Sequence, residues 1–133
     1  MKAPFMLDTD TVSNAMRGAI GITSRLTQYG PPRICISSLT LAELRFGAPR
    51  KKSKRIQALI DAFIHDVQVL AFDASAASRF GTVASVLEDQ GTPIGLMDTL
   101  IASHALDRGA TLVTRNLKHF TKVPGLTVVS WDK

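Results

Sequence analysis

The sequence predicts an α/β fold in which helices cover both faces of a mainly parallel sheet. Short apolar runs typical of buried strands alternate along the chain with segments of helical periodicity. The length of 133 residues suffices for one domain with a substantial core, and no repeat, low-complexity tract or linker divides it. We therefore expect a single domain over residues 1–133. The candidate strands, in order, are "PFML", "ICIS", "VQVLAF", "ATLVT" and "LTVVS".

The first two strands are each followed by a predicted helix. "PFML" precedes a helix that is expected from about Thr11, and "GPPR" then interrupts the chain before "ICIS". After that second strand, Ser38 or Thr40 is a candidate N-cap for the next helix. This helix is expected to end near Gly47 and Pro49.

The clearest helix begins at about Ser53. Its apolar residues recur at intervals of three and four, which places them on one face of a helix. We expect this face to pack mainly in the core, with a share of it available to a partner. The residues of this apolar stripe are Ile56, Leu59, Ile60, Phe63 and Ile64.

The second half of the chain continues the alternation. Asp73 follows the third candidate strand and is the expected N-cap of a helix that reaches about Gln90. "GTPIG" is expected to form a loop, and a further helix runs from about Leu96 to Arg108. Gly109 suits the left-handed residue that ends many helices, and one helical turn is expected at "LKHF".

The composition restricts both the environment and the chemistry. Cys35 is the only cysteine, so neither an internal disulfide nor a thiolate metal cluster is possible. No apolar run approaches the roughly 20 residues that span a bilayer, and Asp8 and Asp10 interrupt any signal-peptide core. We therefore expect a cytoplasmic protein. Its net charge of +5 permits a polyanionic partner such as nucleic acid.

Three acidic residues lie in apolar surroundings where such folds form their functional sites. Asp8 ends the first strand, Glu43 lies on the helix after the second, and Asp98 lies in the first turn of a later helix. The functional crevice of a parallel sheet lies beyond the carboxyl ends of its strands. A buried carboxylate needs a partner, and neither Asp8 nor Asp98 has a lysine or arginine beside it. Clustered carboxylates suit a hard ion, Mg²⁺ or Mn²⁺, which activates water in phosphoryl displacement.

Each of these acids also has a purely structural interpretation. Asp98 could be a first-turn acid that the helix dipole favours, and Glu43 could be a surface residue of its helix. Asp8 or Asp10 could cap the helix that follows them. The spacing alone leaves these alternatives open.

Five segments carry a family resemblance, namely "FMLDTDTVS", "ISSLTLAELRFGA", "IGLMDTLIASHAL", "LVTRN" and "KVPGL". Together they resemble the PIN-domain ribonucleases, and more closely the VapC toxins of bacterial type II toxin–antitoxin systems. The likeness covers nearly the whole chain. It implies a three-layer α/β/α fold with a five-stranded, mainly parallel sheet, and a Mg²⁺- or Mn²⁺-dependent endoribonuclease. It also implies inhibition by a cognate VapB antitoxin and a homodimer in the bacterial cytoplasm.

The resemblance assigns roles to individual residues. Asp8 and Asp98 would hold the ion directly, and Glu43 would bind a metal-bound water or a second ion. Thr114 would hydrogen-bond the scissile phosphate or a metal-bound water, and cleavage would leave a 5′-phosphate and a 3′-hydroxyl. The motifs most resemble the branch that cuts the anticodon loop of initiator tRNA, so tRNA is the expected substrate.

The chain departs from the family pattern at the fourth acidic position. In "TRNLKHF", Asn116 takes the motif position, and His119 stands where a second acid often precedes the phenylalanine. Asn116 can bind a metal through its carbonyl oxygen but brings no charge. Asp10, which stands in place of a family asparagine, either restores some negative charge or merely caps the helix.

A basic run, "PRKKSKR", follows the helix that carries Glu43. It is either a solvated loop or a patch that contacts RNA phosphates beside the cleft. The candidate substrate-binding residues are Arg50, Lys51, Lys52, Lys54 and Arg115.

Three other functions compete with the metal-dependent ribonuclease. A phosphoacceptor domain is disfavoured because "LTVVS" does not end on a lysine and Asp98 falls within a helix. A metal-free ribonuclease would use His104 and His119 as acid and base and would be active in EDTA. A catalytically weak binding or regulatory protein is conceivable because the fourth acid is missing.

Overall fold

The computed structural model describes residues 3–50 and 53–131, which form a five-stranded sheet between two groups of helices. The strand order is β3-β2-β1-β4-β5, and all four pairings of neighbouring strands in this part of the chain are parallel. The predicted fold class is therefore confirmed. The strands are β1 (Phe5–Leu7), β2 (Ile34–Ser37), β3 (Gln68–Leu70), β4 (Thr111–Val113) and β5 (Val128–Val129).

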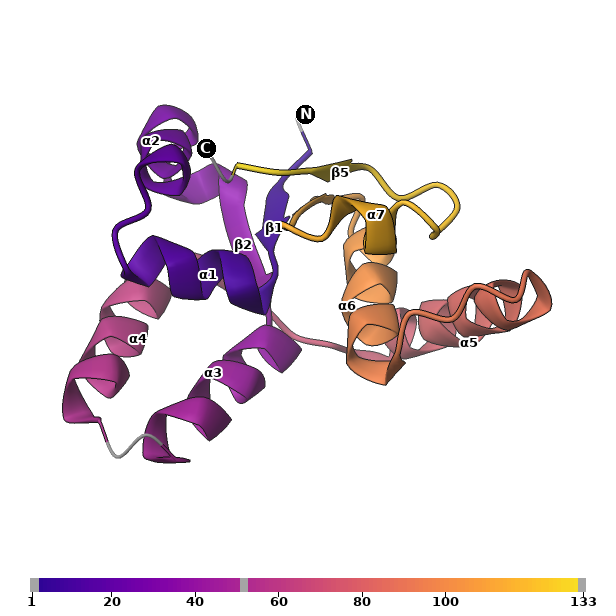
Figure 1. The fold of residues 1–133 in the computed structure, drawn as a ribbon, viewed down its shortest axis with the longest axis horizontal. Coiled ribbons are helices and arrows are strands. Elements are labelled where there is room, and N and C mark those ends of the chain that lie inside the picture. Colours follow the sequence, from indigo (N-terminus) through magenta and orange to yellow (C-terminus); the bar gives the residue numbers. More distant parts are fainter. Residues whose placement is uncertain (1–2, 51–52, 132–133) are drawn as a thin grey trace.

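Helices α1 to α4 lie on one side of the sheet, and α5 to α7 lie on the other (Figure 1). None of the helices in the described ranges is long and apolar enough to cross a membrane. The helices are α1 (Thr9–Met16), α2 (Ile20–Tyr29), α3 (Ser38–Arg50), α4 (Lys54–Asp66), α5 (Ala74–Asp89), α6 (Leu96–Asp107) and α7 (Leu117–Phe120), with a 3₁₀ turn at Pro31–Arg33.

Successive side chains of a strand point to opposite faces of the sheet, so each central strand contributes to a core cluster on either side. On β1, Met6 packs into the cluster formed with α5 and α6, whereas Leu7 packs into the cluster formed with α1, α2 and α4. On β4, Leu112 and Val113 divide in the same way. All four side chains are completely buried. The central strands are thus apolar on both faces, as expected for a parallel sheet that is covered on both sides.

The predicted caps are partly present, and two helix boundaries differ from the prediction. Asp73 caps α5, as predicted, by accepting a hydrogen bond from a backbone N–H, and Ser53 caps α4 in the same way. The prediction of Ser38 or Thr40 as the cap of α3 is wrong, because this helix already begins at Ser38 and the hydroxyl of Ser37 accepts from the backbone N–H of Leu39. The first helix begins at Thr9 rather than near Thr11, and it ends before Gly18, whose φ of 81° interrupts the helix. The sequence analysis missed this break and the separate helix α2 that follows. Helix α3 continues beyond Gly47 to Arg50.

The apolar stripe of α4 is only partly used by the core. Ile60 is buried, whereas the other four residues of the stripe are partly buried. Leu59 lines two grooves on the surface between α4 and the neighbouring helices. The stripe is thus less buried than predicted, and its use by a partner stays a prediction.

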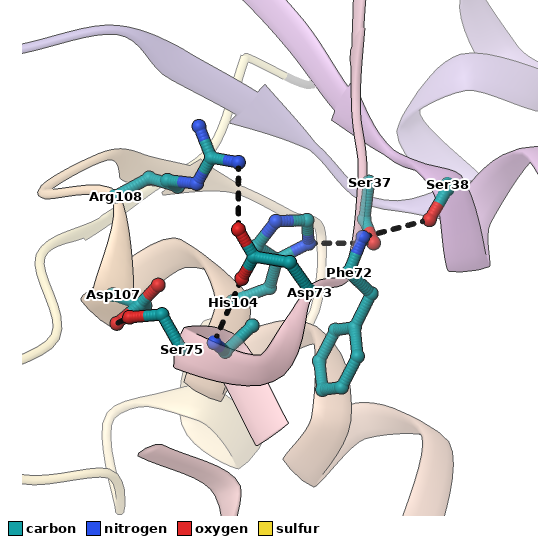
Figure 2. A network of polar contacts seen from close by, with 9 residues as sticks. Ser37, Ser38, Phe72, Asp73, Ser75, His104, Asp107 and Arg108 are labelled. Atoms are coloured by element: carbon teal, nitrogen blue, oxygen red, sulfur yellow. Dashed lines mark hydrogen bonds and ion pairs between the residues drawn. The ribbon is translucent and has the colours of Figure 1, made fainter. Parts of the chain in front are cut away.

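A polar network joins α6 to the ends of β2 and β3 (Figure 2). The completely buried ring of His104 places Nδ1 2.8 Å from Ser37 Oγ. Ser37 Oγ also accepts a hydrogen bond from the backbone N–H of Leu39. Arg108 pairs with Asp73 at 3.6 Å, which ties the end of α6 to the start of α5. This network fixes α6, the helix that carries Asp98.

We predict that His104 makes the stability of the protein depend on pH. Burial, and secondarily the guanidinium of Arg108, hold the pKa of His104 below its ordinary value, and Asp73, Asp107 and the Ala71 backbone offset only part of this. The unfolded chain therefore binds more protons as the pH falls through about 6.5, and stability is lost. One such proton contributes a slope of up to about 1.4 kcal/mol per pH unit.

Urea denaturation at several pH values between about 7.5 and 5.5 would measure this slope. This range is centred on the ordinary pKa of histidine, about 6.5. We expect His104→Gln to have a shallower pH dependence than the wild type. The control is His65→Gln, because the side chain of His65 is 88% exposed and should contribute little. Equal slopes for wild type and His104→Gln would contradict the prediction.

Candidate active site

Asp8 lies at the junction between the central strand β1 and helix α1. Its backbone N–H donates to the carbonyl oxygen of Val113 on β4 at 3.1 Å, which extends the strand pairing by one residue. Its carboxylate accepts a hydrogen bond from the backbone N–H of Thr11 at 2.9 Å and so caps α1. The residue is only 8% exposed. Asp8 is therefore the N-cap of α1, which was its purely structural interpretation. It also lies at the carboxyl edge of the sheet, where a functional site is expected.

Two threonines hold the Asp8 carboxyl group in place. The hydroxyl of Thr114, the buried residue that follows β4, is a hydrogen-bond partner of Asp8. Thr114 Oγ1 also accepts from the backbone N–H of Asn116 at 3.0 Å. Burial raises the pKa of Asp8 above its ordinary value, and the hydrogen bonds from Thr114 and Thr11 offset only part of this effect. Thr114 thus lies against the Asp8 carboxyl group, and its predicted contact with the scissile phosphate or a metal-bound water stays a prediction.

Asp98 lies in the first turn of α6 and faces the same site. Burial raises the pKa of Asp98, the nearby charges of Asp8 and Asp10 raise it further, and His119 lowers it. The charge of Asp8 thus lies close enough to disfavour the ionisation of Asp98. The partly exposed position of Asp98 leaves it accessible to a ligand from solvent.

His119 and Asn116 lie beside Asp98. His119 Nδ1 is 3.2 Å from Asp98 Oδ2 and 2.9 Å from the side-chain nitrogen of Asn116. Asn116 is exposed and forms the N-cap position of α7 without a capping bond from its side chain. The structure thus brings together Asp8, Thr114, Asp98, Asn116 and His119.

Glu43 lies on α3 and is anchored to the start of α1. The hydroxyl of Thr9, the residue next to Asp8, donates a short hydrogen bond to Glu43 Oε1. Glu43 also lines a groove between α1, α3 and α4. This role of Thr9 is not predicted from the sequence, where its only signal is a threonine placed between Asp8 and Asp10.

The structure describes only some of the predicted substrate-binding residues. Lys54 is exposed at the start of α4, and Arg115 is exposed directly after Thr114. Arg50 ends α3, but its side chain lies outside the described part of the structure, as do the whole residues Lys51 and Lys52. The proposed basic patch beside the cleft therefore stays a prediction.

The oxygen donors of this site are of the kind that a hard divalent cation prefers. Asp8 and Asp98 supply oxygen atoms, and their charges oppose one another in surroundings that exclude much of the water. A cation between them would relieve both the repulsion and the cost of burial. Among the described residues, however, no group of three or more His, Cys, Asp or Glu side chains is arranged to hold an ion. Glu43, the third predicted acid, is instead bound to Thr9.

We predict that Asp98→Asn stabilises the metal-free protein near neutral pH. A carboxyl group whose pKa is raised on folding favours the folded state when protonated and opposes it when ionised. Removal of the charge should raise the free energy of unfolding by up to about 1 kcal/mol, since solvent screens a partly exposed group. The gain should vanish as the pH falls below the pKa of Asp98.

Thermal melts in EDTA at several pH values would check this expectation. Asp66→Asn is a matched control, because Asp66 ends α4 at the opposite edge of the sheet and its side chain is 75% exposed. A neutral-pH melting temperature of Asp98→Asn below that of the wild type would count against the prediction.

Comparison with known proteins agrees with the geometry of the site. The PIN domain family matches residues 5–126. The tRNA(fMet)-specific endonuclease VapC of Salmonella typhimurium is 37% identical over 96% of this chain and 97% of its own length. Ribonuclease VapC2 of Rickettsia felis is 42% identical over 75% of either chain. A chain in the crystal structure of DNA-bound VapBC from Salmonella typhimurium has a TM-score of 0.90 and 38% identity, covering 98% of this chain and 99% of that one.

These similarities agree in sequence, length and three-dimensional fold. They extend over the strand ends that carry Asp8 and Thr114 and over the helix that carries Asp98. The chain belongs to the PIN-domain family and, within it, to the VapC ribonucleases.

Proposed function

We propose that this protein is a divalent-metal-dependent endoribonuclease toxin that cleaves tRNA and is neutralised by a VapB-type antitoxin. The observation that carries the proposal is the pair of desolvated carboxyl groups, Asp8 and Asp98, at the carboxyl edge of a VapC fold, where the charge of Asp8 raises the pKa of Asp98. The relative that is named a tRNA(fMet)-specific endonuclease supports initiator tRNA as the substrate. A homodimer in the bacterial cytoplasm, where tRNA is found, completes the proposal.

In this proposal Asp8 and Asp98 bind Mg²⁺ or Mn²⁺, and Glu43 supports the same centre. When bound, such an ion polarises a phosphate oxygen and lowers the pKa of its water. The residues of the chain provide the positioning. Thr114 and the α1 backbone fix Asp8, and Thr9 fixes Glu43, so that the carboxylates are oriented before substrate arrives.

The metal-free alternative lacks the pair of histidines that it needs. His104 is completely buried and hydrogen-bonded to Ser37, so it cannot exchange protons with a bound RNA. His119 alone lies at the site. A carboxylate-metal centre is therefore the better-supported chemistry for this ribonuclease.

The antitoxin is proposed to occupy two grooves on the side of α1, α2 and α4. Their volumes are about 450 and 440 Å³, and Met16 and Leu59 line both of them. Thr9 and Glu43 lie at the first groove as well, so a segment bound there would crowd the active site. Inhibition by occupation of this groove follows from that proximity.

Cleavage of total tRNA by the purified protein tests the catalytic proposal. We expect discrete products with Mg²⁺ or Mn²⁺, none with EDTA, and a rate at least about 100-fold lower for Asp8→Asn, because Asn preserves the cap but removes the charge. Asp66→Asn, at the opposite edge, should cleave like the wild type. Undiminished cleavage by Asp8→Asn in EDTA would refute the mechanism, and folded wild type that never cleaves would favour the regulatory alternative.

A substitution in the groove tests the antitoxin proposal separately. Leu59→Lys should weaken binding of a co-expressed VapB-type antitoxin at least about tenfold, because it places a charge in an apolar contact. Cleavage of tRNA should persist. Gln57→Lys is the matched control, since Gln57 is exposed on the same helix and lines neither groove. If Leu59→Lys binds the antitoxin as tightly as the wild type does, the antitoxin binds another surface.

A further inference from the structure

One face of helix α1 leads from the candidate active site along the first groove. Thr9, Ser13 and Arg17 follow one another at intervals of four residues, so they form a row on one side of the helix and its C-cap. All three line the groove between α1, α3 and α4, and they are called the α1 row below. Thr9 directly follows Asp8, and a rise of about 1.5 Å per residue places Arg17 roughly 12 Å further along the helix. The α1 row thus leads away from the site over a length that a few nucleotides cover.

Two guanidinium groups give this groove a positive charge. Arg17 lines it from the end of α1 and Arg55 from the first turn of α4, and both residues are exposed. Among the described residues of the lining, Glu43 is the one carboxylate, and it accepts the hydrogen bond from Thr9. The groove therefore carries two positive charges and one negative charge.

Neither guanidinium group is neutralised by a neighbouring acid. Within the described ranges of the chain, Arg17 and Arg55 form no ion pair, in contrast to Arg45, which lies 2.7 Å from Asp61. Arg17 Nη1 instead donates to Asn14 Oδ1 at 2.8 Å. This neutral acceptor holds the guanidinium group in place and leaves its charge uncompensated, so the group is prepared to bind an anion.

The second groove on this side of the molecule lacks such a charge. Its described lining contains no lysine or arginine, and its charged residue is Asp66. The two grooves share the apolar side chains of Met16 and Leu59. The positive charge is thus confined to the groove that reaches Thr9 and Glu43 at the active site. This distribution favours the polyanionic substrate, rather than an apolar partner that spans both grooves, as the ligand of the two arginines.

Resting on the proposed ribonuclease, we propose that the α1 row and Arg55 bind the RNA backbone beside the cleavage site, with the guanidinium groups of Arg17 and Arg55 on its phosphates. A guanidinium group presents its donors in a planar fork that matches two phosphate oxygens. The Ser13 hydroxyl, which lies between Thr9 and Arg17 in the row, is a further donor to a phosphate oxygen. Contacts of this kind position an RNA without reading its sequence.

Binding of an initiator tRNA transcript in EDTA, where the proposed mechanism allows no cleavage, is the direct test. The double variant Arg17→Gln/Arg55→Gln should bind at least about tenfold more weakly than the wild type. The slope of log affinity against log salt concentration should become shallower by about 0.7 for each arginine removed. Arg17→Lys/Arg55→Lys keeps both charges and should keep most of the slope.

A control variant separates these contacts from the net charge of the protein. Arg25→Gln/Arg79→Gln removes the same charge from exposed positions on α2 and α5 that line neither groove. Its affinity and salt slope should change much less, because salt screens distant charges. In cleavage with Mg²⁺ or Mn²⁺, Arg17→Gln/Arg55→Gln should raise KM and leave kcat nearly unchanged, since the phosphate contacts are the same before and during the reaction.

The outcomes separate this inference from the proposed function. Wild-type affinity and slope in Arg17→Gln/Arg55→Gln would overturn the phosphate contacts, and a loss of antitoxin binding in the same variant would assign the arginines to the antitoxin. An equal loss of RNA binding in Arg25→Gln/Arg79→Gln would also overturn them, as an effect of net charge alone. A salt slope that depends on Arg17 and Arg55, in a protein whose cleavage needs no metal, would uphold this inference and refute the metal-dependent mechanism.

Discussion

The parallel pairing of β1 between β2 and β4 is the constraint on which the rest of this structure depends. Parallel strands end at the same edge of a sheet, so the residues that follow them are neighbours in space although they are distant in the chain. Asp8 follows β1 and Thr114 follows β4, and their side chains meet there. Ser37, at the end of β2, receives His104 from α6 at the same edge. The burial of both faces of these strands is what holds that edge in place.

The same edge concentrates charge at a cost in stability. Desolvation raises the pKa of Asp8 and of Asp98, which means that folding works against their ionisation. Such a conflict is typical of functional sites, because the interactions that would satisfy these groups come from a ligand. Threonine hydroxyls and the first turn of α1 orient the acids without neutralising them.

Two surfaces meet at this edge and connect catalysis with its control. On one side of the sheet, the buried contact between His104 and Ser37 and the more exposed ion pair between Arg108 and Asp73 hold α6, the helix that carries Asp98 (Figure 2). On the other side, residues of α1, α3 and α4 line a groove that is largely apolar and includes Glu43. The side of the sheet that carries α6 suits the positioning of an ion. The side with the groove between α1, α3 and α4 suits the binding of a partner. The half-exposed stripe of α4 belongs to the second surface.

The sequence by itself determined the order and type of most elements, the acids at their ends and the family. These features depend on local patterns: apolar strand runs, the spacing of the α4 stripe, and caps such as Asp73. The tertiary structure alone decided which side chains meet. The Thr9–Glu43 bond spans 34 residues and the His104–Ser37 bond spans 67, and no local pattern encodes such contacts. Likewise, His119 stands in the sequence as a departure from a motif, and only the packing of α7 against the core brings it to Asp98. Contacts of this kind arise from the burial of remote segments against one sheet, which the sequence specifies only through the complete fold.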